Sequence, residues 1–212
     1  MSGIGLVLNV AKDALLTQQY AIDVVSHNIT NVSTEGYTRQ SPILEAKDAA
    51  PYGGFIFGRG VELNDIIRNA NEFIEKRLRN CQSDLLAMTE KSLYMGVIES
   101  IFDENSGRSL SNQMVDFWNV WNDLSNNPSG QPERSLLAEN ASLLTETFRD
   151  LSSDLIKLDQ EIDKSIQAGI GEVNQILTQI ADINKQILVL EVSGNANDLR
   201  DQRNMLVNKL SK

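Results

Sequence analysis

A run of apolar residues at alternating steps of four and three constrains this chain more than any other feature. Such spacing keeps one stripe of side chains on the same side of a helix, where it faces a partner over many turns. The first run fills the N-terminal segment and comprises Ile4, Leu8, Ala11, Leu15, Gln18, Ile22, Val25, Ile29 and Val32. The pattern predicts a long first helix with coiled-coil-like packing.

Few charges interrupt this first helix. Between residues 1 and 34 the formal charges are Lys12, Asp13 and Asp23. A second column of apolar or small residues lies beside the stripe and comprises Val7, Ala14 and Ala21. A helix that is apolar or small on so much of its circumference is not stable alone in water. We therefore expect it to be buried on more than one side.

The stretch HNITNVSTEGYTRQ, residues 27–40, predicts the end of this helix. Asn, Ser and Thr compete for backbone hydrogen bonds in non-helical conformations, and Gly36 can adopt a positive φ at a helix terminus. From residue 37 the composition changes, because prolines and glycines punctuate short alternating stretches such as GRGVELN. This region is predicted to form extended strands and turns, with one hairpin.

The four-three rhythm returns after the extended region. A second stripe comprises Ile74, Leu78, Cys81, Leu85, Met88, Ser92, Met95, Glu99 and Phe102. It predicts a helix over about 70–102, roughly 50 Å long at 1.5 Å per residue. The stretch DENSGRS, residues 103–109, should end it. A shorter helix is predicted next, ended by SNNPSGQP, with an apolar side of Leu110, Met114, Phe117, Trp118, Trp121 and Leu124.

The longest predicted helix begins near Pro132, a residue that suits the first helical position. Its stripe comprises Leu136, Leu143, Leu151, Leu155, Leu158, Ile162, Ile166, Gly169, Val173, Ile176, Ile180, Ile183, Ile187 and Leu190. An unbroken helix of this extent approaches ~90 Å, although Gly169 and Gly171 are expected to soften or bend it. The stretch VSGNAND should end it, and Leu199, Leu206 and Leu210 mark a final short helix that returns antiparallel.

These elements predict a mainly α protein, an elongated bundle of long coiled-coil-like helices with a small β-rich insert. Three parts are expected: an N-terminal helix over 1–36, an extended or β-rich linker over 37–68, and a helical domain over 69–212. The formal net charge of −10 argues against binding to nucleic acid or to anionic lipid. No apolar window is long enough for a membrane span, and no cleavable signal peptide is visible.

The sequence offers no convincing reaction centre or cofactor site. Asp23, Ser26 and His27 suggest a hydrolytic triad, but adjacent helical residues point apart, so catalysis is disfavoured. A lone His with a single Cys does not make a zinc site, and Cys81 on the stripe is expected to be a small buried hydrophobe. The stretch 103–107 resembles part of a calcium loop but lacks the later bidentate acid. We therefore predict no enzyme activity, no metal and no cofactor.

Three aromatic residues of the short helix, Phe117, Trp118 and Trp121, form the clearest side-chain cluster. Residues four apart share a helix face, and Trp often anchors protein interfaces. The alternative is that the cluster plugs the junction between two long helices, because an extended bundle needs large side chains somewhere. We favour helix-junction packing.

Several segments resemble the axial proteins of the bacterial flagellum. The stretch LLTQQYAIDVVSHNITNVSTEGYTRQ is similar to the N-terminal signature of flagellar rod, hook and hook-associated proteins. Within that group, FWNVWNDLSNNP with Arg134, NDLRDQRNMLVNKLS and GRGVELNDIIRNANEFIEKRLR resemble the FlgK family of hook-associated proteins. Thr30, Ser33 and Glu35 depart from the commoner residues of the signature. Family members are also longer, so the chain resembles an N-terminal portion or a shortened member, incomplete at the C-terminal side of the helical domain.

The resemblance implies a structural, non-enzymatic protein that polymerises at the hook–filament junction and joins hook to filament. It implies that the first helix lies in the inner tube of a helical polymer, against copies of itself, the hook protein and a second junction protein. Export through the flagellar type III channel, without a cleaved signal, is also implied, and an export chaperone is a conceivable partner. The expected assembly surface comprises Leu8, Leu15, Ile22, Val25 and Ile29, and the family turn motif comprises Asn28, Asn31, Gly36 and Tyr37.

Other readings remain open on the residues alone. A rod or hook subunit is the nearest, although the Trp-containing helix and the LRDQR helix argue against it. Periodicity alone also permits a coiled-coil stalk or adhesin, which would form stable dimers. A hydrolase that uses His27 would lose activity on His27→Ala.

Overall fold

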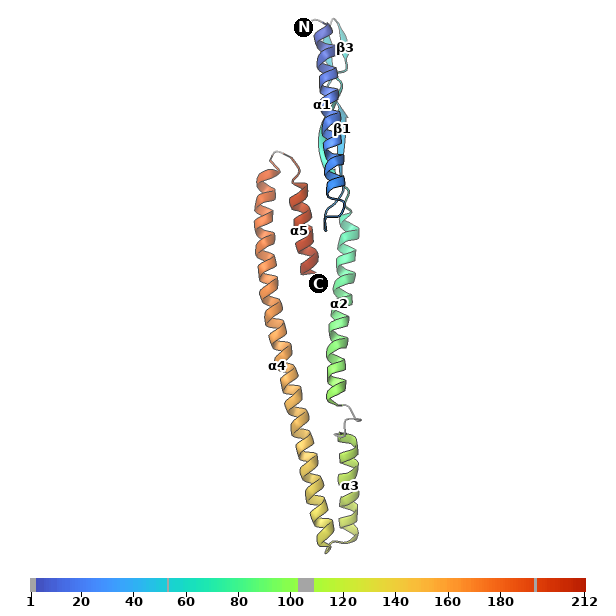
Figure 1. Cartoon of the computed structure of the whole chain (residues 1–212), viewed down its shortest axis with the longest axis vertical. Coiled ribbons are helices and arrows are strands. Elements are labelled where there is room, and N and C mark those ends of the chain that lie inside the picture. The colour runs from blue at the N-terminus through green and yellow to red at the C-terminus, as the bar shows by residue number, and fades with distance from the viewer. Residues whose placement is uncertain (1–2, 53, 103–108, 193) are drawn as a thin grey trace. The chain divides into compact units, whose positions relative to one another are not determined.

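The computed structural model describes residues 3–52, 54–102, 109–192 and 194–212 (Figure 1). Within these ranges lie five helices and four strands. Their order is α1 (Gly3–Thr30), β1 (Gln40–Ala46), β2 (Ala50–Tyr52), β3 (Phe55–Phe57), β4 (Val61–Arg68), α2 (Glu72–Ile101), α3 (Leu110–Asn126), α4 (Gln131–Leu190) and α5 (Asn197–Leu210). The prediction of a mainly α protein of long helices with a small β-rich insert is confirmed.

The chain divides into two compact units. The first, called here the terminal unit, combines residues 1–83 with 173–212, and the second, the middle unit, comprises residues 84–172. The division passes through α2 and α4 rather than through a loop. The terminal unit therefore unites the two ends of the sequence.

The helix boundaries lie close to those expected from the sequence. Helix α4 is continuous over 60 residues and does not break at Gly169 or Gly171. Helix α3 begins after Ser109, whose side chain accepts a 3.1 Å hydrogen bond from the backbone N–H of Asn112, as N-cap serines do. Most of the predicted DENSGRS break, including the calcium-loop-like residues 103–107, lies outside the described residues.

The β-rich insert is one long chain reversal built in two sections. Strand β1 pairs antiparallel with β4, from Gln40 opposite Arg68 to Ala46 opposite Val61, with one irregularity after Ile43. Beyond these strands, β2 pairs antiparallel with β3. The chain thus runs out along β1 and β2 and returns along β3 and β4, as the single predicted hairpin requires.

The hairpin packs along one face of α1. Thr17 and Val24 are buried there, and the Thr17 hydroxyl donates a 3.2 Å hydrogen bond to the carbonyl of Val61. Lys47 forms a 2.8 Å ion pair with Asp13, and its hydrogen bond and charge lower the pKa of the Asp13 carboxyl. The covered face follows its own four-three spacing and comprises Val10, Ala14, Thr17, Ala21, Val24 and Asn28.

In the terminal unit the end of α4 packs with α5, which returns antiparallel as predicted (Figure 1). Ile176 and Ile187 on α4 are buried, in agreement with the stripe expected there. Arg203 of α5 donates a 3.4 Å hydrogen bond to the side-chain oxygen of Asn184, and Arg200 pairs with Glu191 across the loop. The Arg200 hydrogen bond and charge lower the pKa of the Glu191 carboxyl.

The expectation for Cys81 is wrong, because its side chain is exposed. Among the residues of α2, none is buried. In the terminal unit, the side of α2 that faces α5 carries Glu75 and Arg79 and not the residues of the predicted stripe. Glu75 accepts a 3.1 Å hydrogen bond from Asn204, and Arg79 donates one of 3.3 Å to Asn208. Polar pairing therefore decides which side of α2 faces α5.

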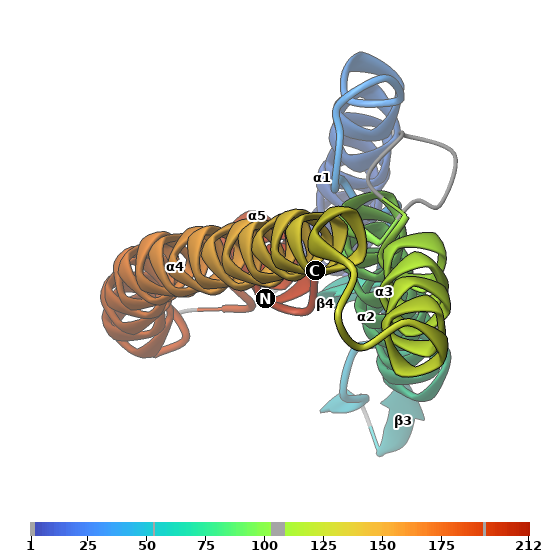
Figure 2. The same cartoon turned by 90° about the horizontal axis from the view of Figure 1, so that it is seen from below.

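In the middle unit, α3 lies beside the N-terminal part of α4 (Figures 1 and 2). The buried Thr147 hydroxyl of α4 donates a 2.6 Å hydrogen bond to the side-chain oxygen of Gln113 on α3. No helix in the described ranges is both long enough and apolar enough to cross a membrane.

Candidate assembly site

The turn that follows α1 is fixed by the side chain of Asn28, which pairs with the start of β1. The Asn28 side-chain oxygen accepts 2.8 Å hydrogen bonds from the backbone N–H of Gln40 and from the hydroxyl of Tyr37. Its amide N–H donates a 2.8 Å hydrogen bond to the carbonyl of Gln40. Asn28 thus imitates a strand partner for Gln40, which satisfies backbone groups where the helix ends.

Gly36 sits at the tightest point of the same turn. Its φ is +77°, a left-handed conformation that glycine adopts without steric strain. The side chain of Met205, on α5, occupies the place where a Cβ at position 36 would lie. Glycine is therefore required here both by the backbone and by the close approach of α5.

Asp201 of α5 holds the residues after the turn. This carboxylate is almost completely buried and accepts a 2.8 Å hydrogen bond from the backbone N–H of Thr38. Its other oxygen accepts a 2.6 Å hydrogen bond from Arg68 at the end of β4, with the two side chains only 6% and 8% exposed. Breaking such a buried pair by removing one partner is strongly destabilising, because it leaves the other charge unpaired.

Asn197 and Asp198, at the start of α5, extend this contact to β1. The buried Asn197 amide donates hydrogen bonds of 2.6 Å to the carbonyl of Ile66 and 3.3 Å to the side-chain oxygen of Gln40. The Gln40 amide donates in turn to Asp198 at 2.8 Å, and His27 Nε2 lies 3.4 Å from the same Asp198 oxygen. We call the set Asn28, Gly36, Tyr37, Gln40, Arg68, Asn197, Asp198 and Asp201 the polar clasp.

Tyr37 lies within the polar clasp with its ring against His27, at a centroid distance of 5.4 Å. Burial raises the pKa of the Tyr37 phenol above its ordinary value, and the negative charges of Asp198 and Asp201 raise it further. The neutral phenol is therefore the form that donates to Asn28.

Asn31, the remaining residue of the expected turn motif, makes only local hydrogen bonds. Its amide donates a 3.0 Å hydrogen bond to the carbonyl of His27, and its side-chain oxygen accepts one of 3.2 Å from Thr34. These bonds end α1 but do not reach α5.

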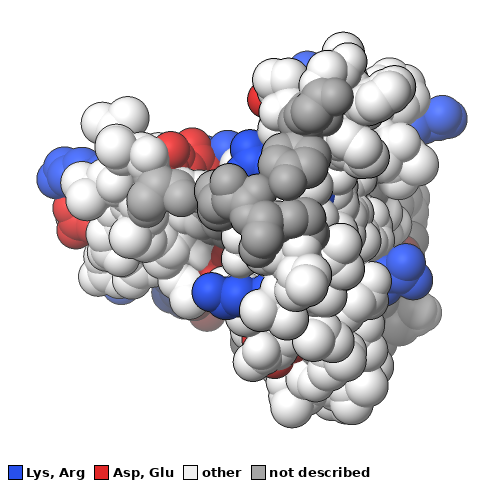
Figure 3. Space-filling view, turned by 90° about the horizontal axis from the view of Figure 1, so that it is seen from above, with Lys and Arg blue, Asp and Glu red and all other residues white. Residues whose placement is uncertain are grey.

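The expected assembly stripe of α1 is exposed along the helix, and at its C-terminal end Val25 and Ile29 lie beside Pro42 of β1. Its five residues are between 53% and 72% exposed, and they are Leu8, Leu15, Ile22, Val25 and Ile29. Ile4 and Val32 continue the stripe at its two ends and are also exposed. Exposed large apolar side chains grouped in this way are typical of interaction sites. Figure 3 shows one face of the molecule on which charged side chains form only small, separate groups.

The aromatic residues of the middle unit lie on α3 beside α4. The Phe117 ring packs edge-on against Trp118 and tilted against Trp121, at centroid distances of 5.4 Å and 6.1 Å. Phe117 and Trp121 line a hollow shared with Leu137 and Ala141 of α4. Both tryptophans remain at least half exposed, at 57% and 50%.

The loop between α3 and α4 is closed by Arg134. Its Nε and Nη2 donate hydrogen bonds of 3.2 Å and 2.8 Å to the carbonyl of Pro128. Asn127 adds a 3.0 Å hydrogen bond to Glu133. The FWNVWNDLSNNP stretch and Arg134 are thereby joined in one structural unit.

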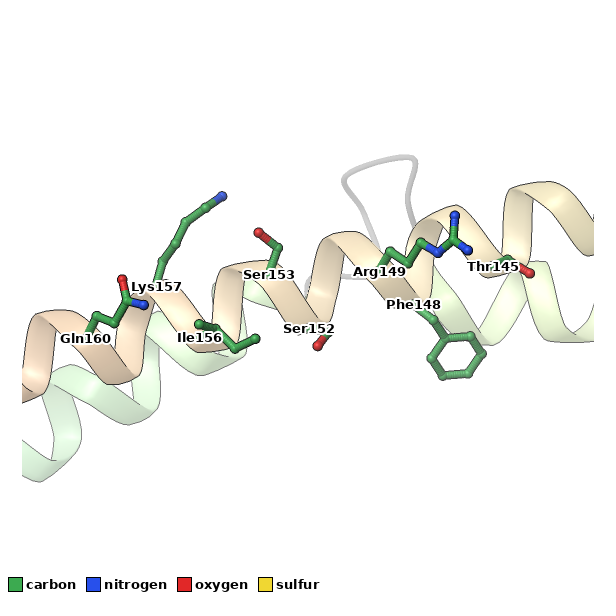
Figure 4. Close-up of a pocket in the computed structure, with 8 residues that line it drawn as sticks. All are labelled: Thr145, Phe148, Arg149, Ser152, Ser153, Ile156, Lys157 and Gln160. Carbon is green, nitrogen blue, oxygen red and sulfur yellow. The ribbon is translucent and has the colours of Figure 1, made fainter.

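The described residues show no cluster typical of metal binding. No group of three or more His, Cys, Asp or Glu is placed to hold a metal ion in those ranges. Figure 4 shows a shallow hollow lined by side chains of α4 alone, among them Phe148, Arg149, Ile156 and Lys157. Lys157 pairs with Asp154, which raises the pKa of the lysine. The charged ammonium that this pairing favours does not act as a general base.

The clasp and the stripe together describe a helical protein whose first helix is anchored at its end and keeps a row of large apolar side chains exposed. Comparison with known proteins identifies the family. The model of the flagellar hook-associated protein FlgK helical domain matches residues 95–212, and that of the flagella basal body rod protein matches residues 8–38. The chain belongs to the family of flagellar hook-associated proteins represented by FlgK.

Curated relatives agree with this assignment. The chain is 30% identical to flagellar hook-associated protein 1 of Bacillus subtilis over 96% of its own length and 42% of the relative's. It is 32% identical to the protein of that name in Salmonella typhimurium, over 97% of the chain and 37% of the relative. For the Escherichia coli protein of that name the identity is 30%, over 96% of the chain and 38% of the relative. The chain thus spans about two fifths of the length of these relatives.

The sequence predicted three of the eight residues of the polar clasp. It named Asn28, Gly36 and Tyr37, but not Arg68, Asn197 or Asp201, which complete the structure around them. A signal was present, because NDLRDQR was among the stretches that carried the family resemblance. The sequence does not show that Asp201 of α5 meets Thr38 and Arg68, because more than 130 positions separate it from each of them along the chain.

Proposed function

We propose that this chain is a structural, non-catalytic part of the bacterial flagellum that polymerises at the hook–filament junction and joins hook to filament. One observation carries the proposal: the large apolar side chains of the stripe are exposed, yet the same helix is already packed by the hairpin on another face. A helix with one face satisfied and another left apolar is suited to contact with other subunits.

The polar clasp supports this role because it anchors the stripe. It joins the end of α1 to β1, β4 and α5 through hydrogen bonds and a buried ion pair. A subunit that transmits torque needs such a connection, since a freely hinged helix would absorb the applied force. The contacts proposed for the stripe are with copies of the chain and neighbouring axial proteins, including the hook protein and a second junction protein.

Other parts of the proposal rest on family membership. They are an extracellular location in the flagellum and export through the flagellar type III channel without cleavage of a signal peptide. A rod or hook subunit is the alternative that a specific observation favours, because the rod-protein model matches residues 8–38. The longer match over residues 95–212 favours the junction.

A charge placed on the stripe tests the proposal. Leu15, which is 72% exposed, belongs to the stripe and is not part of the clasp. Leu15→Asp in the full-length protein should leave its helix content unchanged by circular dichroism, abolish swimming and leave hooks without filaments. Asn9→Asp adds the same charge at an exposed polar position on a different side of the same helix, and those cells should swim.

Location distinguishes the junction from the rod or hook. Antibody labelling of purified flagella should place the protein in a short zone between hook and filament. Normal swimming of the Leu15→Asp cells, or absence of the protein from flagella, would contradict the proposal. Labelling along the rod or the whole hook would favour the alternative subunit.

A further inference from the structure

Helix α5 carries a line of four polar residues along one side. Asn197, Asp201, Asn204 and Asn208 are spaced four, three and four positions apart, so they share one side of the helix. Each of them forms a hydrogen bond with the turn, the hairpin or α2, and none of these bonds is with α4. We call this set the polar line.

The contact that the polar line makes is built from hydrogen bonds and one ion pair. At one end Asp201 accepts hydrogen bonds of 2.8 Å and 2.6 Å from the Thr38 backbone and from Arg68. At the other end Asn208 accepts a 3.3 Å hydrogen bond from Arg79 of α2. The two residues of α5 that are buried, Asp201 and Asn197, both belong to the polar line.

The opposite side of α5 is apolar and faces α4. Leu199, Leu206 and Leu210 lie about half a turn away from the polar line, and all three are partly buried. Arg203, on the same side as these leucines, donates a 3.4 Å hydrogen bond to Asn184 of α4. Helix α5 is therefore attached by an apolar side to α4 and by a polar side to the turn, the hairpin and α2.

Separation has different costs on the two sides. When hydrogen-bonded groups separate, water replaces the lost partner, so each bond contributes little net free energy. The Arg68–Asp201 pair behaves in the same way, because both ions regain their hydration when they part. Apolar side chains have no such compensation when they enter water. The polar side of α5 is therefore the side that opens first.

We infer that α5 is a latch, which releases the turn, the hairpin and α2 together along the polar line while it stays on α4. The four residues act as a unit because they are fixed on one rigid helix. The closed latch holds the end of α1 to the helical part of the chain, and the open latch frees α1 and its hairpin to adjust to a neighbouring subunit. This use of the latch rests on the proposed function.

The turn keeps its own shape when the latch opens. Asn28 bonds to both backbone groups of Gln40 and to the hydroxyl of Tyr37, and these bonds lie within residues 28–40. The N–H of Thr38, by contrast, has its acceptor on α5, in Asp201. Opening therefore exposes the Thr38 amide to water and leaves the Gln40 amide bonded.

Native-state hydrogen exchange, followed by NMR on the whole chain, tests the inference. The backbone amides of Thr38 and Gln40 form hydrogen bonds of equal length, 2.8 Å, but the first acceptor is on α5 and the second on α1. After correction for intrinsic exchange rates, Thr38 should be at least about tenfold less protected than Gln40 and than Leu206, inside α5. Equal protection of Thr38 and Gln40 overturns the inference, because both amides then open only together. Equal protection of Thr38 and Leu206 also overturns it, because α5 then melts instead of separating.

Asn204→Ala tests whether the polar line opens as a unit. The substitution removes a 3.1 Å hydrogen bond to Glu75 and leaves every bond of Thr38 in place. Alanine is the better helix former, so fraying of α5 does not account for an effect. If the line opens as a unit, the protection of Thr38 should fall about fivefold, the value of one hydrogen bond.

Gln202→Ala is the matched control, at an exposed position of α5 outside the polar line, and should leave the protection of Thr38 unchanged. Unchanged protection in Asn204→Ala, or an equal fall in both variants, overturns the inference. Asn208→Ala, at the far end of the line, replaces Asn204→Ala if that variant unfolds. These measurements use the single chain, so a failure of the swimming or labelling experiments contradicts the proposed function and leaves the latch unaffected.

Discussion

The polar clasp and the stripe of α1 are adjacent, but the clasp residues have their partners within this chain and the stripe residues do not. In the clasp, Asn28, Gln40, Asn197 and Asp201 find their hydrogen-bond partners within this chain. On the stripe, the large apolar side chains remain mostly in water. Helix α1 therefore carries one region whose partners are supplied by folding and one that folding leaves exposed.

The difference shows how such a subunit separates folding from assembly. Buried polar groups need partners in fixed geometry, so they define one arrangement of α1, the hairpin and α5. Apolar surface has no such directionality, and it can be covered by whichever neighbour presents a matching surface. Substitutions in the clasp should therefore affect stability, and substitutions on the stripe should affect assembly.

The largest expected effect comes from breaking the buried ion pair of the clasp. Asp201→Ala leaves Arg68 charged and buried and the Thr38 N–H without its partner, so it should lower the free energy of unfolding by about 3–5 kcal/mol. The measurement is urea denaturation followed by circular dichroism. As a control, Asp182→Ala removes a partner of Lys185 from an exposed pair and should change stability by less than about 1 kcal/mol. Similar losses from both variants would remove the distinction between clasp and surface.

A smaller change in stability is expected at Gly36 in the turn, and a change of opposite sign at Gly169 in α4 serves as its control. Gly36→Ala should destabilise by about 1–3 kcal/mol, because alanine at positive φ is strained and its Cβ meets Met205. Gly169→Ala, in the middle of α4 with open space around its Cβ, should stabilise by up to about 1 kcal/mol. Thermal unfolding of the two variants measures both. Partial recovery of Gly36→Ala by Met205→Ala would show that the contact with α5 contributes to the strain.

The smallest effect concerns the Tyr37 phenol. Tyr37→Phe removes one hydrogen bond to Asn28 and should cost about 1 kcal/mol at neutral pH. In the native chain, the raised pKa of Tyr37 means that its contribution is complete below the ordinary pKa near 10 and is lost as pH rises through the folded value. The stability difference between wild type and Tyr37→Phe should therefore shrink in alkali. A difference that stays constant from pH 9 to pH 12 would contradict this assignment.

Much of the fold follows from local sequence pattern. The ends of α1 and α2 and the 60-residue span of α4 agree with four-three spacing bounded by Asn, Gly and Pro, because helix formation depends on residues close together in the chain. The hairpin after Tyr37 is predictable for the same reason. Gly36 could be expected at a turn, but its contact with Met205 could not.

Local residue patterns are enough to predict that this chain forms long helices, that its first helix is apolar on several sides and that an amide-rich turn ends it. Only the tertiary structure decided which stripe of α1 receives the hairpin and which remains exposed, since both follow the same spacing. It also decided that Asp201 pairs with Arg68 and that Cys81 faces solvent. The physical reason is that periodicity fixes which residues share a face, whereas contact between faces depends on groups brought together from distant parts of the chain.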